Sequence, residues 1–423
     1  MLKNQFENWK NIYYEYPRTF WVLIAVSFID QLGGALLFPF FAFYVTMHFN
    51  VGMVEVGYLF AFFSVSNFAG SILGGALTDR FGRKQIIIFS LIATSISSVF
   101  MGLAASMTAF YVIAVLSGLF SVGGPARQSM VADILPEKKR AQGYGLLRVA
   151  ANLSVAIGPA IGGILLGVTS YLTLFIVDAV ISLIVAGLFA AFIPETKSEV
   201  ALSSSPESVS DSFVGYFVVF RDLLFMTFIV VCILMGLVYT NLNTTLGVYL
   251  RDMFSVTEAS FGLLLSLNAM MVVLFQFAVT RRIENRPPLL VMAAGMLLYA
   301  IGFGLYGFVS SMAMFAVAMV ILTTGEMLIA PVSQALVAKF SPEEMRGRYM
   351  AIFGISWMIP FAVGPYLAGL VLDNLDPRWL WYIVGVVGLF TTLGFLGLHR
   401  KVDAPVETVE NEKLPEIAVE AAL

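Results

Sequence analysis

Long apolar segments set the strongest limit on how this chain folds. Twelve of them, each about 20 residues or longer, follow one another along the 423 residues. Lipid offers the backbone no hydrogen-bond partner, so each segment should be a membrane-crossing helix, and the segments are too long for barrel strands. The predicted spans, numbered 1 to 12, are residues 19–46, 54–77, 85–104, 108–133, 142–167, 171–193, 222–250, 258–281, 288–309, 312–338, 346–371 and 378–399.

The few charged residues orient these spans. Only 12% of the residues are charged, against roughly 25% in soluble domains. Of the 24 Lys and Arg residues, 20 lie on one side of the predicted membrane, while Arg251 and Arg378 lie on the opposite side and Arg127 and Arg148 fall within spans. Basic connections face the cytoplasm, so we expect a multi-pass plasma-membrane protein with both termini in the cytoplasm. The polar N-terminus lacks the apolar core of a secretory signal, so span 1 should remain in the protein.

The rest of the composition narrows the function classes. The net charge is -3 and no basic stripe is present, so no nucleic-acid partner is expected. One cysteine, Cys232, and two histidines predict no metal site, no cofactor and no catalytic set. A Gly-x-x-x-x-Gly-Lys loop is absent, which disfavours ATP as the energy source. The expected partners are the lipid bilayer and a small molecule. No enzyme reaction on that molecule is expected.

A polar, serine-rich stretch divides the chain near its middle. Residues 194–221 are predicted as a cytoplasmic linker between an N-terminal six-helix bundle, residues 1–193, and a C-terminal six-helix bundle, residues 222–399. Residues 400–423 form an acidic tail that is predicted to be disordered.

The two bundles repeat each other. Residues 135–140 (LPEKKR) align with residues 341–346 (SPEEMR), and the same offset aligns Gly158-Pro159 with Gly364-Pro365. Matches at one offset indicate duplication. The chain is therefore predicted to be an all-α membrane protein with twelve transmembrane helices in two pseudo-symmetric six-helix bundles.

A short charged segment lies between spans 2 and 3. Residues 74–84 read GGALTDRFGRK, and their glycines permit a tight turn. The segment resembles the signature Gly-x-x-x-Asp-Arg-x-Gly-Arg-Lys of the major facilitator superfamily, a family of twelve-span secondary transporters. The matching residues are Gly75, Asp79, Arg80, Gly82, Arg83 and Lys84. The repeat partner, residues 280–290, keeps the charge and lacks the glycines.

Two further segments are similar to motifs of this family. In span 1, Leu32-Gly33 followed by Pro39 is similar to a motif of the twelve-span drug:proton antiporters. In span 5, an antiporter-like Gly-Pro-x-x-Gly-Gly motif is formed by Gly158, Pro159, Gly162 and Gly163, and Gly364 and Pro365 repeat its start in span 11. The resemblance implies a monomer with a central cavity between the halves, lined by spans 1, 4, 7 and 10.

Polar groups on those four spans are the candidate chemistry. Charge inside a bilayer costs about 2.5–3.5 kcal/mol per residue on insertion scales, yet Asp30, Arg127 and Glu326 lie on spans 1, 4 and 10. Span 7 adds Asn241 and Asn243. Removal from water disfavours an ionised carboxyl, so such a group is able to exchange protons near neutral pH or to pair with a cation. The alternative is that each charge only anchors a helix, and Arg127 has the further option of pairing with Asp133.

A third acid within the predicted spans is expected to be structural. Asp178 lies on span 6, which the resemblance places away from the cavity.

The charged turn between spans 2 and 3 is predicted to act as a cytoplasmic latch. Asp79 would face the N-terminal end of span 11, where unpaired backbone N–H groups favour an anion. Arg83 would pair with Asp133 at the foot of span 4. These contacts would hold an outward-open state, and a bent span 5 packed on a bent span 11 would seal one end of the cavity.

The leading functional hypothesis is a secondary active transporter for proton-coupled efflux of hydrophobic or cationic small molecules. Protons would be the coupling ion. The alternative within transport is a carrier of a defined metabolite such as a sugar or an amino acid. A non-transporting receptor or a membrane enzyme is disfavoured, because no nucleophile and base or metal set is present.

Overall fold

The computed structural model describes residues 15–196, 217–342 and 345–402, and it is all helical there. Most of the predicted linker and the predicted disordered tail beyond Val402 lie outside the described residues. Twelve segments of the described chain are long and apolar enough to cross a membrane, which confirms the twelve predicted spans. The protein is a multi-pass membrane protein.

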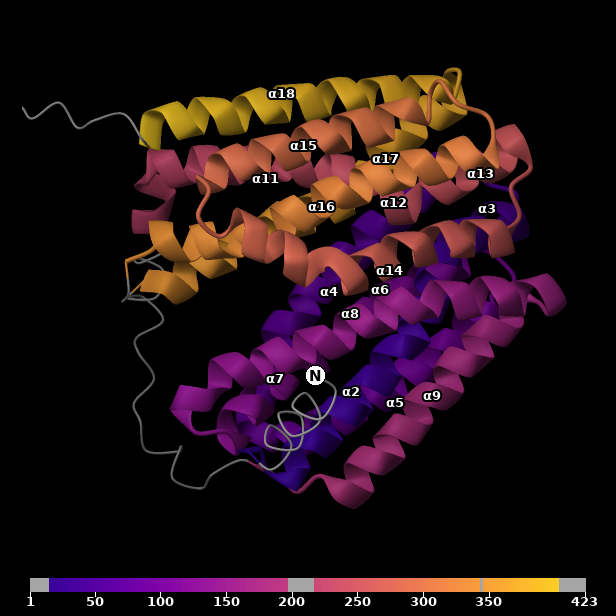
Figure 1. The fold of residues 1–423 in the computed structure, drawn as a ribbon. Coiled ribbons are helices and arrows are strands. Elements are labelled where there is room, and N and C mark those ends of the chain that lie inside the picture. Colours follow the sequence, from indigo (N-terminus) through magenta and orange to yellow (C-terminus); the bar gives the residue numbers. More distant parts are fainter. Residues whose placement is uncertain (1–14, 197–216, 343–344, 403–423) are drawn as a thin grey trace, which may run out of the picture.

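The helices form two sets of six spans that lie side by side (Figure 1). The N-terminal half contains α2 (Arg18–Leu37), η1 (Phe38–Phe40), α3 (Phe41–Phe49), α4 (Met53–Phe81), α5 (Arg83–Gly102), α6 (Met107–Leu119), α7 (Gly123–Ile134), α8 (Glu137–Val168) and α9 (Tyr171–Phe192). The C-terminal half contains α11 (Leu223–Tyr239), α12 (Asn241–Thr244), α13 (Leu246–Phe254), α14 (Glu258–Ile283), α15 (Pro288–Leu305), α16 (Met312–Phe340), α17 (Arg346–Asn374) and α18 (Arg378–Val402).

Spans 1, 4 and 7 are interrupted, where the sequence predicted continuous helices. In span 1 a turn of 3-10 helix, Phe38–Phe40, separates α2 from α3, and Pro39 lacks the N–H that a continuous α-helix needs there. In span 4 residues 120–122 separate α6 from α7. In span 7 the helix breaks at Thr240 and at Thr245, so that α12 is a single short turn.

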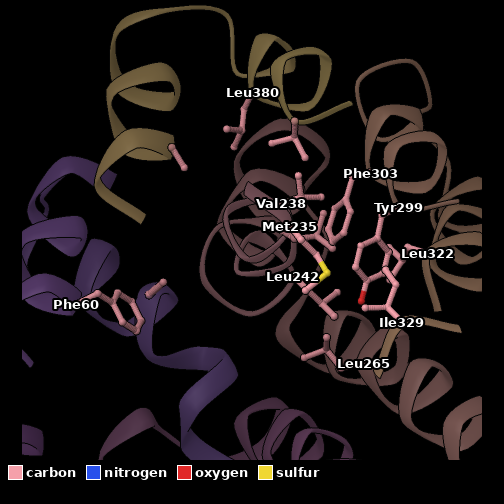
Figure 2. Packing of buried hydrophobic residues seen from close by; sticks show 14 of the residues in the cluster. Phe60, Met235, Val238, Leu242, Leu265, Tyr299, Phe303, Leu322, Ile329 and Leu380 are labelled. Atoms are coloured by element: carbon pink, nitrogen blue, oxygen red, sulfur yellow. The ribbon is translucent and has the colours of Figure 1, made fainter. Parts of the chain in front are cut away.

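Apolar packing holds the C-terminal half together around α11. Figure 2 shows Met235 and Val238 of α11 beside Phe303 of α15, while Phe60 lies apart from them on the N-terminal half. Met235 and Phe303 are fully buried. A bundle with such a centre behaves as one packed body.

The halves meet through two helix pairs. Helix α4 packs along α17, and α8 packs along α14. At the second pair the helices approach so closely that a Cβ on Gly163 would lie 2.9 Å from the carbonyl oxygen of Glu258. The expectation that span 5 packs on span 11 is therefore wrong: each of these helices takes a partner from the other half, span 8 for span 5 and span 2 for span 11.

The two ends of the molecule differ in how the halves are joined. We call the end that carries Arg80, Arg83 and Lys84 the basic end and the opposite one the far end. At the far end Arg251 Nη1 donates to Thr46 Oγ1 at 3.0 Å, and the Tyr171 hydroxyl donates to Glu258 Oε1 at 2.8 Å. In Figure 1 the helices of the two halves converge at the far end and spread apart toward the basic end.

Candidate transport cavity and charged groups

A cavity of about 500 Å³ lies between the two halves, and we call it the interhalf cavity. Its wall comes from η1 and α4 on one side and α17 on the other. Pockets for small molecules typically combine an apolar wall with a few polar groups. The interhalf cavity fits this description, with the lining residues Phe38, Phe60, Phe63, Ser64, Asn67, Phe68, Ser71, Ala351, Gly354, Ile355, Trp357, Met358 and Phe361.

Glu326 of α16 is half-buried behind this wall. The Tyr239 hydroxyl donates to Glu326 Oε1 at 3.1 Å, and Asn268 Nδ2 donates to Oε2 at 2.8 Å. No Lys, Arg or His among the described residues forms an ion pair with Glu326. The carboxyl is thus held by two neutral donors.

One aromatic contact connects Glu326 with the interhalf cavity. Trp357 lines the cavity and meets the Tyr239 ring edge to face, with 5.6 Å between the ring centroids and 89° between the ring planes. Tyr239 in turn holds the carboxyl. Glu326 is therefore connected to the cavity wall through two side chains, Tyr239 and Trp357.

Asp30 and Arg127 form an ion pair inside the N-terminal half. Asp30 Oδ2 lies 2.6 Å from Arg127 Nη2, and the two side chains are 16% and 21% exposed. The predicted option of an Arg127–Asp133 pair is wrong, because Asp30 takes the guanidinium. The charge on Asp30 is already compensated in this conformation, so a cation would have to displace Arg127 to reach it.

The span 7 amides differ from the expectation of cavity-facing groups. Asn241 is buried, and its Nδ2 donates to the carbonyl oxygen of Leu237 at 2.7 Å while its Oδ1 accepts from Thr245 Oγ1 at 2.7 Å. The first bond satisfies a backbone carbonyl where the helix breaks, and the second joins two side chains across the break. Asn243 is half-buried, and its side chain has no hydrogen-bond partner among the described residues.

The charged turn holds its predicted internal pair. Arg83 Nε lies 3.0 Å from Asp133 Oδ2, which joins the start of α5 to the end of α7. Thr196 Oγ1 donates to the same carboxylate oxygen at 3.0 Å. The Asp79 side chain and the first two side chains of α17 lie outside the described residues, so the predicted latch between them stays a prediction.

Glu195 completes the charged turn, and sequence reasoning missed it. Its two carboxylate oxygens accept the backbone N–H groups of Arg83 and Lys84, at 2.9 and 3.1 Å, at the start of α5. A helix N-terminus favours an anion. The available signal was an acid two residues after the end of predicted span 6, beyond Pro194.

Gly82 fits this capping arrangement for two reasons. Its φ of 95° is one that residues with a side chain rarely adopt, and a Cβ there would lie 2.5 Å from Glu195 Oε2. Lys84 Nζ adds a hydrogen bond to the carbonyl oxygen of Ala190 at 2.7 Å, while the Arg80 guanidinium lies over the Phe81 ring.

The antiporter-like motif brings helices close together. Gly158 and Gly162 face the backbone of α2, and Gly163 faces α14 of the other half. The repeat copy in α17 includes Gly364, which faces Thr240 at the break in span 7. Pro159 and Pro365 lie within their helices, and the motif positions are contact surfaces between spans.

Asn268, Tyr239 and Trp357 complete the surroundings of Glu326. Tyr239 belongs to the polar cluster that the sequence places on span 7, whereas Asn268 and Trp357 were not among the residues predicted from the sequence. Asn268 is an isolated amide in an otherwise apolar part of span 8, and that isolation was the available signal. Within residues 15–196, 217–342 and 345–402, no group of three or more His, Cys, Asp or Glu side chains is arranged to hold a metal ion.

Twelve membrane-crossing helices in two halves with a cavity between them define a transporter fold. Residues 23–328 and 229–421 match, in two overlapping alignments, the family model described as the Major Facilitator Superfamily. The chain belongs to this superfamily, so it is a secondary transporter of a small molecule and not an enzyme.

Known proteins resemble the chain over most of its length. The "Na(+), Li(+), K(+)/H(+) antiporter" of Planococcus maritimus is 27% identical over 418 residues, covering 91% of this chain and 96% of that protein. The multidrug resistance protein MdtH of Shigella flexneri is 23% identical over 386 residues, covering 88% of this chain and 87% of its own length. The crystal structure of the nucleoside transporter NupG superposes with a TM-score of 0.76 at 12% identity, covering 90% of this chain and 99% of that one, and a POT family transporter with a TM-score of 0.75 at 16% identity, covering 92% and 97%.

Proposed function

We propose that this protein is a proton-coupled exporter of hydrophobic or cationic small molecules that works by alternating access. One observation carries the proposal. Glu326 is a carboxyl inside a membrane bundle, held by neutral donors, with no ion pair to any described residue. An ionised carboxylate without an opposite charge is costly in such a place, so a proton is its simplest partner.

The contacts of Glu326 connect proton exchange with the cavity. The Tyr239 ring lies between the carboxyl and Trp357 of the cavity wall. Ionisation strengthens the hydrogen bonds that Tyr239 and Asn268 donate. Protonation and substrate occupancy therefore compete through the same side chains, which is the requirement for antiport.

The cavity wall supports a hydrophobic or cationic substrate. Six of its members carry Phe or Trp rings, namely Phe38, Phe60, Phe63, Phe68, Trp357 and Phe361. Aromatic faces accept both apolar groups and cations. The relatives named as a multidrug resistance protein and as an antiporter support the same assignment.

The charge distribution supports a cytoplasmic basic end in the plasma membrane. The far end is closed by contacts between the halves, so this conformation would be the inward-facing one. A substrate would then enter the interhalf cavity from the cytoplasm. Proton binding from outside would follow once the far end opens.

A second candidate is exchange of protons for monovalent metal cations. The Planococcus maritimus relative carries such a name. Oxygen atoms that could contact a metal cation lie close together here: the Tyr239 hydroxyl bonds Glu326, and Asn268 Nδ2 donates both to Glu326 and to Thr323 Oγ1. Transport of a defined metabolite is a third outcome of the same test. The NupG and POT structures share the fold alone.

Proteoliposomes with an imposed pH gradient test the proposal. We expect the wild type to move an aromatic cationic dye against its gradient at the expense of the pH gradient, and Glu326→Gln to lose the gradient dependence. Glu284→Gln, an exposed acid at the end of α14, is the matched control. Collapse of the pH gradient by Na⁺ or K⁺ but by no organic cation would favour the second candidate, and unchanged gradient dependence in Glu326→Gln would refute the coupling role.

A further inference from the structure

The N-terminal half contains a second cavity, of about 170 Å³. We call it the Asp178 cavity. It is enclosed by spans 1, 2, 3, 4 and 6, and it combines phenylalanine rings, hydroxyl groups and a single acid. Its most relevant lining residues are Phe38, Phe41, Phe60, Phe63, Ser98 and Asp178.

Asp178 is an acid without an opposite charge beside it. It lies in the middle of α9, only 7% of the residue is exposed, and its side chain reaches the cavity. Among the residues that the structure describes, no Lys, Arg or His forms an ion pair with it. The neighbouring Ser98 hydroxyl donates to the carbonyl oxygen of Phe175 at 3.1 Å. An ionised carboxylate buried without an opposite charge is costly, so its expected partner is a proton or a cation.

Asp30 is the other acid in this part of the N-terminal half. Asp30 lies one turn before Gly33 on α2, and it is neutralised by Arg127. Gly33 brings α9 close, since a Cβ there would lie 3.0 Å from Asp178 Oδ1. The interior of this half therefore holds two acids and one guanidinium in the same region, and the guanidinium pairs with Asp30 rather than with Asp178.

The Asp178 cavity adjoins the interhalf cavity. Phe38, Phe60 and Phe63 belong to the walls of both. Their rings form the partition between the two cavities. A ligand in the interhalf cavity therefore has the Asp178 cavity as a side pocket.

The size and chemistry of the side pocket define a class of ligand. Aromatic faces together with a carboxylate recognise quaternary and tertiary ammonium groups. An apolar protein cavity of about 150 Å³ holds a benzene molecule, so about 170 Å³ admits a group the size of trimethylammonium. A bare metal ion would need several oxygen ligands in place of rings.

We propose that the Asp178 cavity binds the ammonium head of an organic cation, with the Asp178 carboxylate as its counter-ion and the phenylalanine rings around it. The rest of such a molecule would occupy the interhalf cavity. This assignment names the substrate class of the proposed exporter and rests on that function only for the transport step. Binding itself follows from the cavity.

Gly34 offers a way to close the side pocket without touching the acid. It lines the cavity, and a Cβ there would meet nothing within 4 Å. Gly34→Leu should fill the space and leave the fold intact. Gly187→Leu is the matched control, because Gly187 lies on α9, is exposed and also has nothing within 4 Å of its Cβ position.

Equilibrium binding of tritiated phenyltrimethylammonium to the full chain in lipid nanodiscs, without a pH gradient, tests the proposal. We expect saturable binding to the wild type and to Gly187→Leu, and at least tenfold weaker binding to Asp178→Asn and to Gly34→Leu. Thermal unfolding checks that each variant is folded, and Gly34→Leu decides the question if Asp178→Asn does not fold. The neutral isostere tert-butylbenzene should compete at least tenfold less well than the unlabelled cation.

Three results would overturn the proposal: no saturable binding to the wild type, equal affinity in folded Asp178→Asn or Gly34→Leu, or equal competition by the neutral isostere. Because no gradient is present, these results are independent of proton coupling. The proteoliposome assay tests proton coupling and this assay tests cation binding, so either proposal can fail while the other holds.

Discussion

The Asp373 carboxylate at the end of α17 caps the first turn of α4 from across the interface between the halves. Its Oδ1 accepts the backbone N–H of Met53 at 2.9 Å, and its Oδ2 accepts that of Val54 at 2.7 Å. Helices α4 and α17 run antiparallel, so the predicted latch of Asp79 on the start of α17 would be the reciprocal contact at the basic end. One helix pair would then carry one capping acid for each closed state.

Asp373→Asn should weaken closure at the far end. A carboxylate at a helix N-terminus contributes about 0.3–1 kcal/mol, and up to about 2 kcal/mol when partly buried, so the equilibrium should shift by roughly two- to thirtyfold toward the open far end. Spin labels at Ser170→Cys and Leu375→Cys, both exposed and on different halves, report the opening. Asp376→Asn is the control, because Asp376 accepts from Arg378 N within one half. Identical distance distributions in Asp373→Asn and wild type would contradict the prediction.

Gly82→Ala should destabilise the charged turn. The added Cβ meets Glu195, and φ at 95° is strained for alanine, at a cost of about 1–3 kcal/mol. We expect a lower melting temperature and slower transport. Gly187→Ala, whose Cβ position is open, should match the wild type in both. A wild-type melting temperature in Gly82→Ala would mean that the turn rearranges without cost.

Asp30→Asn should leave the Arg127 guanidinium uncompensated. Removal of one partner of a buried pair costs about 3–5 kcal/mol, and the residual exposure of 16% and 21% lowers our expectation to about 1–3 kcal/mol. The double variant Asp30→Asn/Arg127→Gln should recover part of the loss. A double-mutant cycle on thermal stability measures the coupling, and additive single effects would show that the pair does not stabilise the half.

Tyr239→Phe should separate proton coupling from substrate exchange. The ring keeps its contact with Trp357, but Glu326 loses one of its two donors. A hydrogen bond to a charged group contributes about 1.5–3 kcal/mol, so ionisation of the carboxyl becomes harder and transport driven by a pH gradient should fall about tenfold or more. Substrate exchange without a gradient should change little. An equal decline of both rates would instead indicate damage to the cavity.

The features predicted from the sequence depend on residues that are close together along the chain or lie at helix ends. Apolar runs located all twelve spans because hydrophobic length is a local property, as for predicted residues 288–309 and observed Pro288–Leu305. The Arg83–Asp133 pair was also predictable, since both residues sit at helix ends on the basic side.

Contacts that depend on helix rotation were not predictable. The sequence does not decide whether Arg127 pairs with Asp133 or with Asp30. The packing of α7 against α2 places Arg127 beside Asp30. Asp178 was expected to be structural because of its span, yet its side chain reaches a cavity. The breaks in spans 1, 4 and 7 were not predicted, because the apolar runs continue on both sides of Pro39, of residues 120–122 and of the polar residues 240–245.

The breaks in spans 1 and 7 each leave a short helix at the far end, α3 in span 1 and α13 in span 7. Helices α3 and α13 have nine residues each, so each is roughly 13 Å long at 1.5 Å per residue. A tilt of about 20° at the break moves the outer end of such a helix by about 4–5 Å, which is enough to separate Arg251 from Thr46. The Arg251–Thr46 contact can therefore break by the swing of two small segments while α2 and α11 keep their packing within each half.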